Sequence, residues 1–499
     1  MHFKYFYTKN LIKAFLITAF FTTAFLACSS SDSPTYVVSI QPVNDNNVPA
    51  LQSFVHGVNG SDWLLFAGRT NQPDSLIGGL HNLNANYAST SFIPYSFNES
   101  MYVYNIDSNK LWSLPIGTLI QTLNQNLKTN ISKTLFINTN PLVTQDDEGY
   151  LYVVGGYGPD IADTNYGTYN QIARIYVPSM INLIKGDLEN VNWTKLIHVG
   201  TDPSNKLIST GGELFEINDT LYLAGGQNFG STQSSGQQYV SAVYPFTVTD
   251  SGLFGLNVNV GPSISDFANP LDSASANNSI FHRRDAPIVP SIYQNGSGTA
   301  QGITFYTGVF TANPNALEAW NDAIYVHPDL KINNNLYTYD SLYNQGNNCV
   351  YACADFEAYD SNTNLLHTFL LGGIGTGSTS ANLSGFTNNG VHITMNIDSL
   401  KSSYELLTNV FPPDTTHIYG AESDFVLNQN GPVFYTTTGG EQTEALDLAK
   451  TFANGVDSVD VGYIYGGIVA FQPNPGSYGS GLSAASNQIW KVTLKKVSN

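Results

Sequence analysis

The chain has 499 residues and a net charge of −19, yet only 11% of its residues are charged, less than half of the roughly 25% typical of soluble domains. The lack of a basic face argues against nucleic acid as a partner, and the scarcity of charged helix formers argues against a coiled coil or helical bundle. A 42% share of hydrophobic residues suffices for a large core, and 44 Gly, 30 Tyr and 27 Phe are typical of strands joined by turns. We therefore expect an all-β protein.

Residues 1–27 are predicted to be a secretory signal peptide. Three lysines precede an apolar run at 14–25, which is too short to span a bilayer comfortably. The Leu-Ala-Cys sequence ending at Cys28 resembles the lipidation box of bacterial lipoproteins, with Phe25 where an aliphatic residue is usual. The resemblance implies that Cys28 is lipidated and, because Ser29 rather than Asp follows, that the protein is held on the outer membrane, facing the periplasm or the outside. An ordinary signal peptide with a chance cysteine is the alternative.

Residues 28–35 are predicted to be a flexible tether, and residues 36–499 a single domain. Removal of residues 1–27 takes away three lysines and no acid, which moves the net charge from −19 to −22. The mature sequence has no second apolar run of membrane-spanning length, so the lipid is the expected attachment to the membrane.

One sequence unit recurs along the domain at intervals of 64 to 94 residues. Each copy is an apolar, aromatic-rich run that ends in one or two glycines and follows a second apolar strand and a turn. The copies are Trp63–Gly68, Tyr150–Gly156, Leu221–Gly226, Thr304–Gly308, His367–Gly373 and Gly462–Gly467. The glycines predict positive φ and close backbone approach between neighbouring repeats.

This unit resembles the kelch repeat, the blade of galactose-oxidase-like β-propellers. The resemblance implies six blades, or seven if Gly439-Gly440 marks another; without a preceding strand pair, we interpret that segment as an insertion in the last blade. We expect the strand at Tyr36–Ile40 to close the ring by joining the last blade, which ends at Gln488–Leu494. A β-sandwich would need a shorter chain and a β-helix a shorter period.

Cys349 and Cys353 are the two cysteines left in the mature chain. In an extended strand their Cα atoms would lie about 13 Å apart, so a disulfide requires a turn between them. A disulfide and two buried free cysteines remain the alternatives. No second Cys/His pair stands at zinc-ligand spacing, so we expect no metal site there.

Polar residues at the ends of the repeat strands are the candidate ligand-binding residues, because propellers bind ligands at one mouth of the central channel. Arginine is scarce, and three of the four arginines stand at such positions. Arginine with carboxylates could bind a sugar or a carboxylated ligand bidentately, or form ion pairs that tie blades together. The candidates are His56, Arg69, Tyr157, Glu213, Gln227, Arg283, Arg284, Asp285, Asp355, Glu422 and Asp424.

Known propeller enzymes fit the sequence poorly. A radical copper oxidase needs two Tyr, two His and a cross-linked Cys, and no His pair here has ligand-like spacing. A sialidase needs Asp-box turns, which are absent. Paired-acid hydrolysis and a kelch-type sugar epimerase stay open, although no motif places their catalytic residues.

A wider resemblance runs from His56-Gly57 through the His282–Asp285 segment to Gly462–Ile468, and it covers nearly the whole mature chain. It is to a group of uncharacterised kelch-like bacterial lipoproteins, which implies a fold and a location but no activity. We therefore expect a monomeric binding module for a glycan or a protein, without a cofactor. A sugar-active enzyme, epimerase-like or hydrolase-like, that uses the channel-mouth Arg and carboxylates is the alternative.

Overall fold

The computed structural model describes most of the chain after its N-terminal segment. The signal peptide expected at 1–27, Cys28 and nearly all of the tether lie outside the described residues. The described residues are 35–44, 47–71, 79–80, 92, 96–160, 165–230, 236–268, 270, 277–311, 318–376, 384–412, 416–474 and 482–497.

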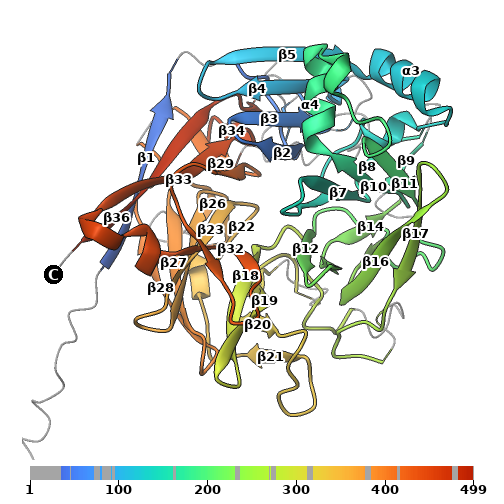
Figure 1. Cartoon of the computed structure of the whole chain (residues 1–499). Coiled ribbons are helices and arrows are strands. Elements are labelled where there is room, and N and C mark those ends of the chain that lie inside the picture. The colour runs from blue at the N-terminus through green and yellow to red at the C-terminus, as the bar shows by residue number, and fades with distance from the viewer. Residues whose placement is uncertain are drawn as a thin grey trace, which may run out of the picture.

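Strands dominate the described chain, and they form four-stranded antiparallel groups that follow one another around a common axis (Figure 1). This is the arrangement of an all-β propeller, as expected from the sequence. From the axis outwards, the groups are β2 (Val55–Asn59), β3 (Asp62–Phe66), β4 (Ser100–Asn105) and β5 (Lys110–Pro115); β6 (Leu142–Gln145), β7 (Tyr150–Val154), β10 (Ile172–Tyr176) and β11 (Ile197–Gly200); β12 (Glu213–Ile217), β13 (Thr220–Ala224), β16 (Val243–Ser251) and β17 (Gly255–Val260); β18 (Ile288–Asn295), β19 (Gly298–Tyr306), β20 (Ala323–Val326) and β21 (Tyr337–Asp340); β23 (Ala354–Asp360), β24 (Leu365–Leu371), β27 (Gly390–Asn396) and β28 (Lys401–Leu407); and β30 (Asp424–Leu427), β33 (Ser458–Tyr465), β36 (Ile489–Val497) and β1 (Thr35–Val43).

The first strand closes the structure by joining the last group. β1 pairs antiparallel with β36 along its whole length, from Thr35 opposite Val497 to Val43 opposite Ile489. Ile40 is buried in the core of this group. The predicted closure by an N-terminal strand is confirmed. The outermost strand of the last group is β1, from the N-terminal end of the domain, and not a strand from the C-terminal end.

An insertion between β30 and β33 carries a hairpin to the axis. The hairpin comprises β31 (Phe434–Thr436) and β32 (Gln442–Asp447), followed by α6 (Leu448–Thr451) and η6 (Ala453–Gly455). β32 pairs in parallel with β23, so the hairpin lies on the axial side of that strand (Figure 1). The interpretation of Gly439-Gly440 as part of an insertion in the last repeat is therefore confirmed.

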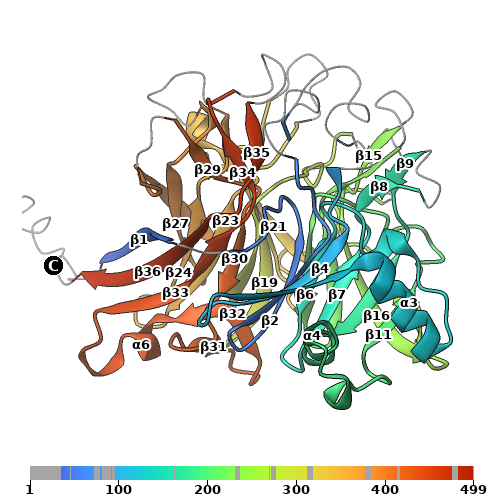
Figure 2. The same cartoon turned by 90° about the horizontal axis from the view of Figure 1, so that it is seen from above.

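Short sheets extend the large ones at one end of the axis, whereas β31 and α6 lie at the other end (Figure 2). Each short sheet contains one strand that comes just after a glycine-terminated strand. They are β8 (Tyr157–Pro159) with β9 (Tyr166–Thr168); β14 (Gln227–Phe229) with β15 (Gln237–Tyr239); β22 (Val350–Tyr351) with β25 (Ile374–Thr376) and β26 (Ser384–Phe386); and β29 (Ile418–Ala421) with β34 (Ile468–Ala470) and β35 (Ser483–Ala485).

Two helices cover the outside of the first two groups, and sequence patterns had not indicated them. α3 (Ile116–Leu127) buries Leu119 and Leu123 against the core, and α4 (Val177–Lys185) buries Met180. The other helical elements are single turns: η2 (Lys133–Leu135), η3 (Leu188–Asn190) and η5 (Gly346–Asn348). Among the described helices, none is long and apolar enough to cross a membrane.

Glycines allow neighbouring groups to approach each other closely, as the repeat predicted. Gly155 has a φ of +68°, and a Cβ there would lie 2.0 Å from the carbonyl oxygen of Ser209 in the next group. A Cβ on Gly466 would likewise lie 2.7 Å from the carbonyl oxygen of Leu51. Any side chain at these positions would push the sheets apart.

Candidate functional site

A ring of residues with left-handed backbone conformation surrounds one end of the axis. Each ring residue lies two or three positions before an innermost strand, and its φ lies between 47° and 66°. Five backbone N–H groups each donate to the carbonyl oxygen of the preceding ring residue, at 2.8 to 3.2 Å. The ring residues are Ser53, Asn140, Gly211, Asp285, Ala352 and Glu422. We call the end of the channel that this ring borders the mouth.

Side chains join the ring where its first and last members meet. The Ser53 hydroxyl donates to Glu422 Oε2 at 2.6 Å, and the Gln52 amide also donates to that oxygen. Arg69 Nε donates to Gln52 Oε1 at 2.8 Å, and the Arg69 guanidinium stacks on Phe92. Arg69 is only 4% exposed, and burial lowers its pKa to about 10 while Glu422 opposes that effect. Arg69 therefore stabilises the junction between Ser53 and Glu422 from a buried position, through its hydrogen bond to Gln52.

A second arginine and carboxylate meet across the ring. Arg284 pairs with Asp285, and both side chains keep about a fifth of their surface exposed. Arg284 Nε also donates to the Tyr239 hydroxyl at 3.1 Å. Tyr351 lies near the Arg284–Asp285 pair: burial raises its pKa to about 12, Asp285 and then Glu422 add to the rise, and Arg284 opposes it. The mouth thus carries the Arg284–Asp285 ion pair and a chain of hydrogen bonds from Arg69 through Gln52 to Glu422.

Arg283 was predicted to lie at the channel mouth, but the structure places it elsewhere. It is fully buried, donates to Asp322 Oδ1 at 2.5 Å and to the carbonyl oxygen of Thr307 at 2.9 Å, and stacks on Trp320. Consecutive residues of an extended segment point in opposite directions, so Arg283 and Arg284 cannot both face the ligand. Arg283 corresponds to the alternative of an ion pair that stabilises the structure.

Acidic side chains from several innermost strands gather below the ring. Glu213 and Asp424 begin β12 and β30, Asp355 and Glu357 lie on β23, and Glu444 lies on the inserted β32. We call these five residues the axial cluster. His56 on β2 lies beside the axial cluster, because its Nδ1 is 3.0 Å from Asp424 Oδ2. Four of the candidates from sequence, His56, Glu213, Asp355 and Asp424, therefore come together from four different groups of strands.

Burial and mutual repulsion change the proton affinity of the axial cluster. Burial raises the pKa of Asp355 to about 8, with additional contributions from Glu444 and Asp424. Burial also raises the pKa of Glu213 well above its usual range, and Asp355 and Asp424 raise it further. These shifts follow from removing carboxylates from water and placing like charges together.

Glu444 brings a carboxyl to the cluster that no motif had indicated. Its side chain keeps contact with solvent, yet protein surrounds it closely enough that burial raises its pKa to about 7, against the opposing effect of His56. The only signal in the sequence was the Gly-Gly insertion, and nothing in the sequence predicts that β32 pairs with β23.

Glu357 is the most buried member of the axial cluster, with 4% of its surface exposed. Its Oε1 has no hydrogen-bond partner among the described residues. Burial raises its pKa well above the usual range, and Asp355 and Glu444 add to this rise. A carboxyl in this setting either holds a proton or requires a donor from a ligand or a water molecule.

Two further candidates lie beside the mouth on the short sheets. Tyr157 is 6% exposed and packs edge-on against Phe92 and Phe229, so it contributes to the wall. Gln227 is half-buried at the start of β14, where its backbone pairs with that of Thr210. Both are close to the ring, but neither belongs to the axial cluster.

Cys349 and Cys353 are free thiols, so the disulfide alternative is not realised. The extended strand β22 lies between them, and Cys349 Sγ donates to the carbonyl oxygen of Gly346 at 3.1 Å. Within the described part of the chain, no three His, Cys, Asp or Glu side chains are grouped so that they could hold a metal ion.

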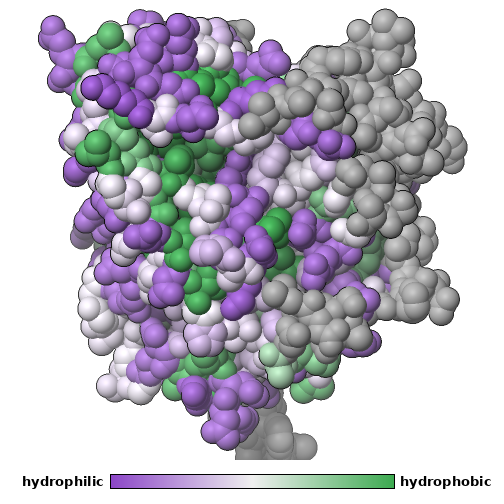
Figure 3. All heavy atoms as spheres, turned by 90° about the vertical axis from the view of Figure 1, so that its right-hand side faces the viewer, coloured by the Kyte–Doolittle hydropathy of each residue, from purple (hydrophilic) through white to green (hydrophobic). Residues whose placement is uncertain are grey.

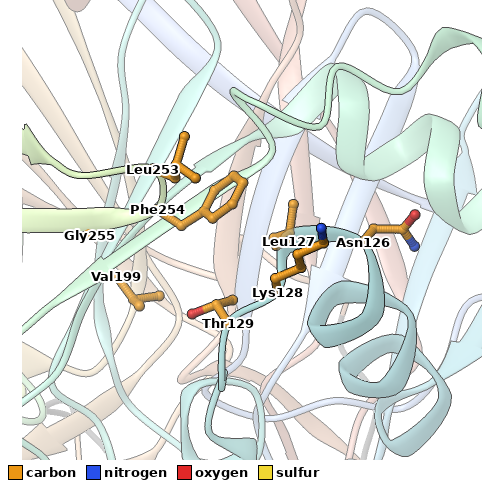
Figure 4. A pocket seen from close by; sticks show the side chains of 8 residues that line it. All are labelled: Asn126, Leu127, Lys128, Thr129, Val199, Leu253, Phe254 and Gly255. Atoms are coloured by element: carbon orange, nitrogen blue, oxygen red, sulfur yellow. The ribbon is translucent and has the colours of Figure 1, made fainter.

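A separate pocket lies at the outer strands of the second and third groups, away from the innermost strands that follow the ring. Its volume is about 460 Å³, and it lies between the end of α3 and the β16–β17 turn, where Leu253 and Phe254 face Leu127 and Lys128 (Figure 4). This side of the molecule shows apolar areas interrupted by polar ones (Figure 3). The pocket has no acidic or arginine side chain in its lining.

Similarity of this chain to known proteins is confined to solved structures. No protein-family model matches the chain, and no curated protein matches its sequence. Among solved structures, that of YjhT matches with a TM-score of 0.38 and 11% identity, over 84% of this chain and 97% of that chain. The description of the fold therefore rests on the strand pairing of this chain itself.

Proposed function

We propose that the protein is a six-bladed, kelch-type β-propeller that binds a glycan at the mouth of its channel. Six groups of four strands and six ring residues support this number of blades. The repeat resembles kelch, and the short sheets after the glycine-terminated strands fit loops that border a ligand site. The protein is a monomer, exported and held on the outer membrane through a lipid on Cys28.

The observation that carries the proposal is the convergence of polar side chains from separate blades on one end of the channel. Carboxylates, arginine and amide groups recognise sugar hydroxyls through directional hydrogen bonds, and the partly exposed pair Arg284–Asp285 lies close enough to the axial cluster for Asp285 to raise the pKa of Glu213. The core of a protein–protein interface is usually depleted of charged residues, by contrast, and the mouth is rich in them.

A glycan array tests this proposal with the full-length protein in detergent. Wild type is expected to bind a defined set of glycans, while Asp424→Asn and Arg284→Ala lose at least tenfold in affinity. Glu189→Gln is the matched control, because Glu189 is an exposed acid on η3, remote from the channel. Identical profiles for all four proteins would refute the assignment of the site.

The lipid anchor has its own test. Wild type expressed in a bacterium with radiolabelled palmitate is expected to incorporate label and to fractionate with the outer membrane, whereas Cys28→Ser incorporates none and leaves that fraction. A Cys28→Ser protein that stays in the membrane with unchanged mass would contradict lipidation.

A sugar-active enzyme is the second candidate, favoured by one specific observation. Burial raises the pKa of Asp355 to about 8, and Asp424 Oδ2 lies 3.0 Å from His56 Nδ1, where it can orient the imidazole as a base. Incubation of array-positive glycans with the protein, followed by mass spectrometry and NMR of the anomeric protons, would reveal hydrolysis or epimerisation. Turnover that disappears in Asp355→Asn would establish catalysis, and unchanged glycans would leave binding as the function.

A further inference from the structure

Two buried histidines and one acid form a hydrogen-bonded chain on the fifth group of strands. His367 Nδ1 lies 3.0 Å from His392 Nε2, and His392 Nδ1 lies 2.7 Å from Glu405 Oε1. Both histidines are 6% exposed, whereas the Glu405 side chain is 63% exposed. We call His367, His392 and Glu405 the histidine chain.

The strand register places the histidine chain where the closing strand contacts the fifth group. His392 lies opposite Phe369 on β24 and Glu405 on β28, and directly opposed residues share one face of a sheet. His367 stands two positions before Phe369 on β24, so it shares that face. The Tyr36 ring of β1 packs edge-on against His367, with ring centroids 5.2 Å apart. The closing strand β1 therefore contacts the buried end of the histidine chain.

The hydrogen-bond pattern suits neutral imidazoles and leaves no place for a further proton. The carboxylate of Glu405 requires a donor, so His392 Nδ1 carries a proton and His392 Nε2 accepts from His367 Nδ1. His367 Nε2 is then a bare acceptor, and it has no hydrogen-bond partner among the described residues. A proton on that nitrogen would be a buried charge without an acceptor, and a proton on His392 Nε2 would turn two N–H groups toward each other.

Burial disfavours the charged form of both histidines. It lowers the pKa of His367 to about 3, and the neighbouring His392 contributes to this decrease. Burial also lowers the pKa of His392, although Glu405 opposes this effect. The Glu405 side chain is mostly in solvent, so screening weakens its attraction for an imidazolium.

Titratable groups on the neighbouring elements have partners of their own. On β23, Asp360 Oδ2 accepts a hydrogen bond from the Tyr36 hydroxyl at 3.3 Å, and burial raises the pKa of Tyr36, so that it stays neutral. At α6, Asp447 pairs with Lys450 at 3.0 Å, and Phe452, at the end of this helix, packs on Tyr36.

Two lysines stand on strands beside the histidine chain. Lys496 lies opposite Tyr36 in the β1–β36 pair, and Lys401 precedes Glu405 on the same face of β28. Positive charges on these strands disfavour an imidazolium, so they add to the preference for neutral histidines.

We propose that the histidine chain makes closure of the propeller pH-sensitive: it holds β1 in place at neutral pH, and protonation of its imidazoles in mild acid releases β1. This release does not depend on a glycan at the mouth. Once β1 has separated, water reaches both imidazoles, and their pKa returns to about 6.5. The closed state lacks these protons, so opening becomes more favourable as the pH falls below about 6.5, by up to about 25-fold per histidine between pH 7 and pH 5.

Hydrogen exchange of the full-length protein in detergent, followed by mass spectrometry, tests this release. Protection factors, which are corrected for the intrinsic pH dependence of amide exchange, are compared at pH 7 and pH 5 for β1 and for the inner strand β7. β1 is expected to lose protection at least tenfold relative to β7. Equal changes in β1 and β7, or an unchanged β1, would overturn the proposal.

A double variant, His367→Asn with His392→Gln, removes the titration and keeps hydrogen-bonding atoms in place. The Asn amide supplies a donor near the position of Nδ1, the Gln amide supplies an acceptor near that of Nε2, and neither group titrates. Protection of β1 in this variant is expected to change less than threefold between pH 7 and pH 5. A loss as large as that of wild type would contradict the role of the histidines.

His417→Gln is the matched control. His417 is a half-buried histidine just before β29 and does not belong to the histidine chain. The control is expected to lose protection of β1 in acid as wild type does. Circular dichroism and thermal unfolding show whether each variant is folded.

Nuclear magnetic resonance of wild type with ¹⁵N-labelled histidine decides the question even if the double variant does not fold. The rings of His367 and His392 are expected to remain neutral as long as β1 is protected, and to become protonated together with its loss of protection. Protonation of either ring near pH 6.5 while β1 stays protected would refute the proposal.

Discussion

Replacement of Asp355 by Asn should make the protein more stable at alkaline pH, although it changes a residue of the candidate site. Burial raises the pKa of Asp355 from 3.8 to about 8, and Glu444 and Asp424 contribute to the rise. Between these two pH values the folded protein holds a proton that the unfolded chain has released. Folding stability therefore decreases as the pH rises from about 4 to about 8, and the substitution removes this decrease.

The size of the effect follows from the pKa difference. Each pKa unit corresponds to about 1.4 kcal/mol, so a difference of about four units sets a ceiling of roughly 5–6 kcal/mol. Glu213, Glu357 and Glu444 share the same charge environment and can take up part of the change. We therefore expect Asp355→Asn to gain about 2 kcal/mol relative to wild type between pH 4.5 and pH 8.5.

Urea unfolding monitored by tryptophan fluorescence measures this at pH 4.5, 6, 7 and 8.5. The wild-type free energy of unfolding should decline across the series more steeply than that of Asp355→Asn, and the two should be close at pH 4.5. Glu189→Gln should run parallel to wild type. A constant difference between wild type and Asp355→Asn at every pH, or a variant that loses stability as steeply as wild type when the pH rises, would refute the assigned burial of this carboxyl.

The remaining predictions concern stability. Arg283→Met should cost about 3–5 kcal/mol in urea unfolding, because it leaves Asp322 without the charge that it pairs with at 2.5 Å; a loss below 1 kcal/mol would contradict the buried pair. Glu422→Gln should cost about 1–3 kcal/mol by weakening the junction with Ser53, and a thermal melt unchanged from wild type would show that this junction is dispensable. Ile40→Asp should cost more than about 2 kcal/mol, because Ile40 is 7% exposed in the closing strand; retention of wild-type resistance to proteolysis would argue against closure by β1.

The repeating strands could be predicted because their signals are local. Apolar runs that end in glycine specify strand and turn within about ten residues, and the close approach at Gly155 explains why glycine is needed there. The closing strand could also be predicted, because a propeller needs a strand that joins its first and last repeats, and Tyr36–Ile40 is an apolar strand that precedes the first repeat. The helices α3 and α4 were not predicted, because the sequence was interpreted as repeated strands and their apolar residues, such as Leu119 and Met180, lie between those strands.

The candidate site was only partly predictable, because it depends on contacts between distant segments. Acids and His56 at strand beginnings could be named in advance, since all innermost strands start at the same end. Whether Arg283 or Arg284 faces the mouth depends on the backbone conformation of the segment before β18, and the sequence alone does not predict that conformation. Glu444 reaches the axis only because β32 pairs with β23, a parallel contact between residues about ninety positions apart.

The ring explains why side chains, and not the backbone, must provide recognition at the mouth. Five of the ring N–H groups already donate to ring carbonyl oxygens, so these backbone groups are not available to a ligand. The proposed glycan would therefore have to form its hydrogen bonds with side chains such as Arg284, Asp285 and Glu422. Below them stand the acids of the axial cluster and His56, and at a pH above the raised pKa of Asp355, about 8, negative charge at the axis is expected to select against anionic sugars. An anionic sugar that bound more tightly than its neutral counterpart would contradict this reasoning, and a comparison of glucuronic acid with glucose tetramers on the array would reveal it.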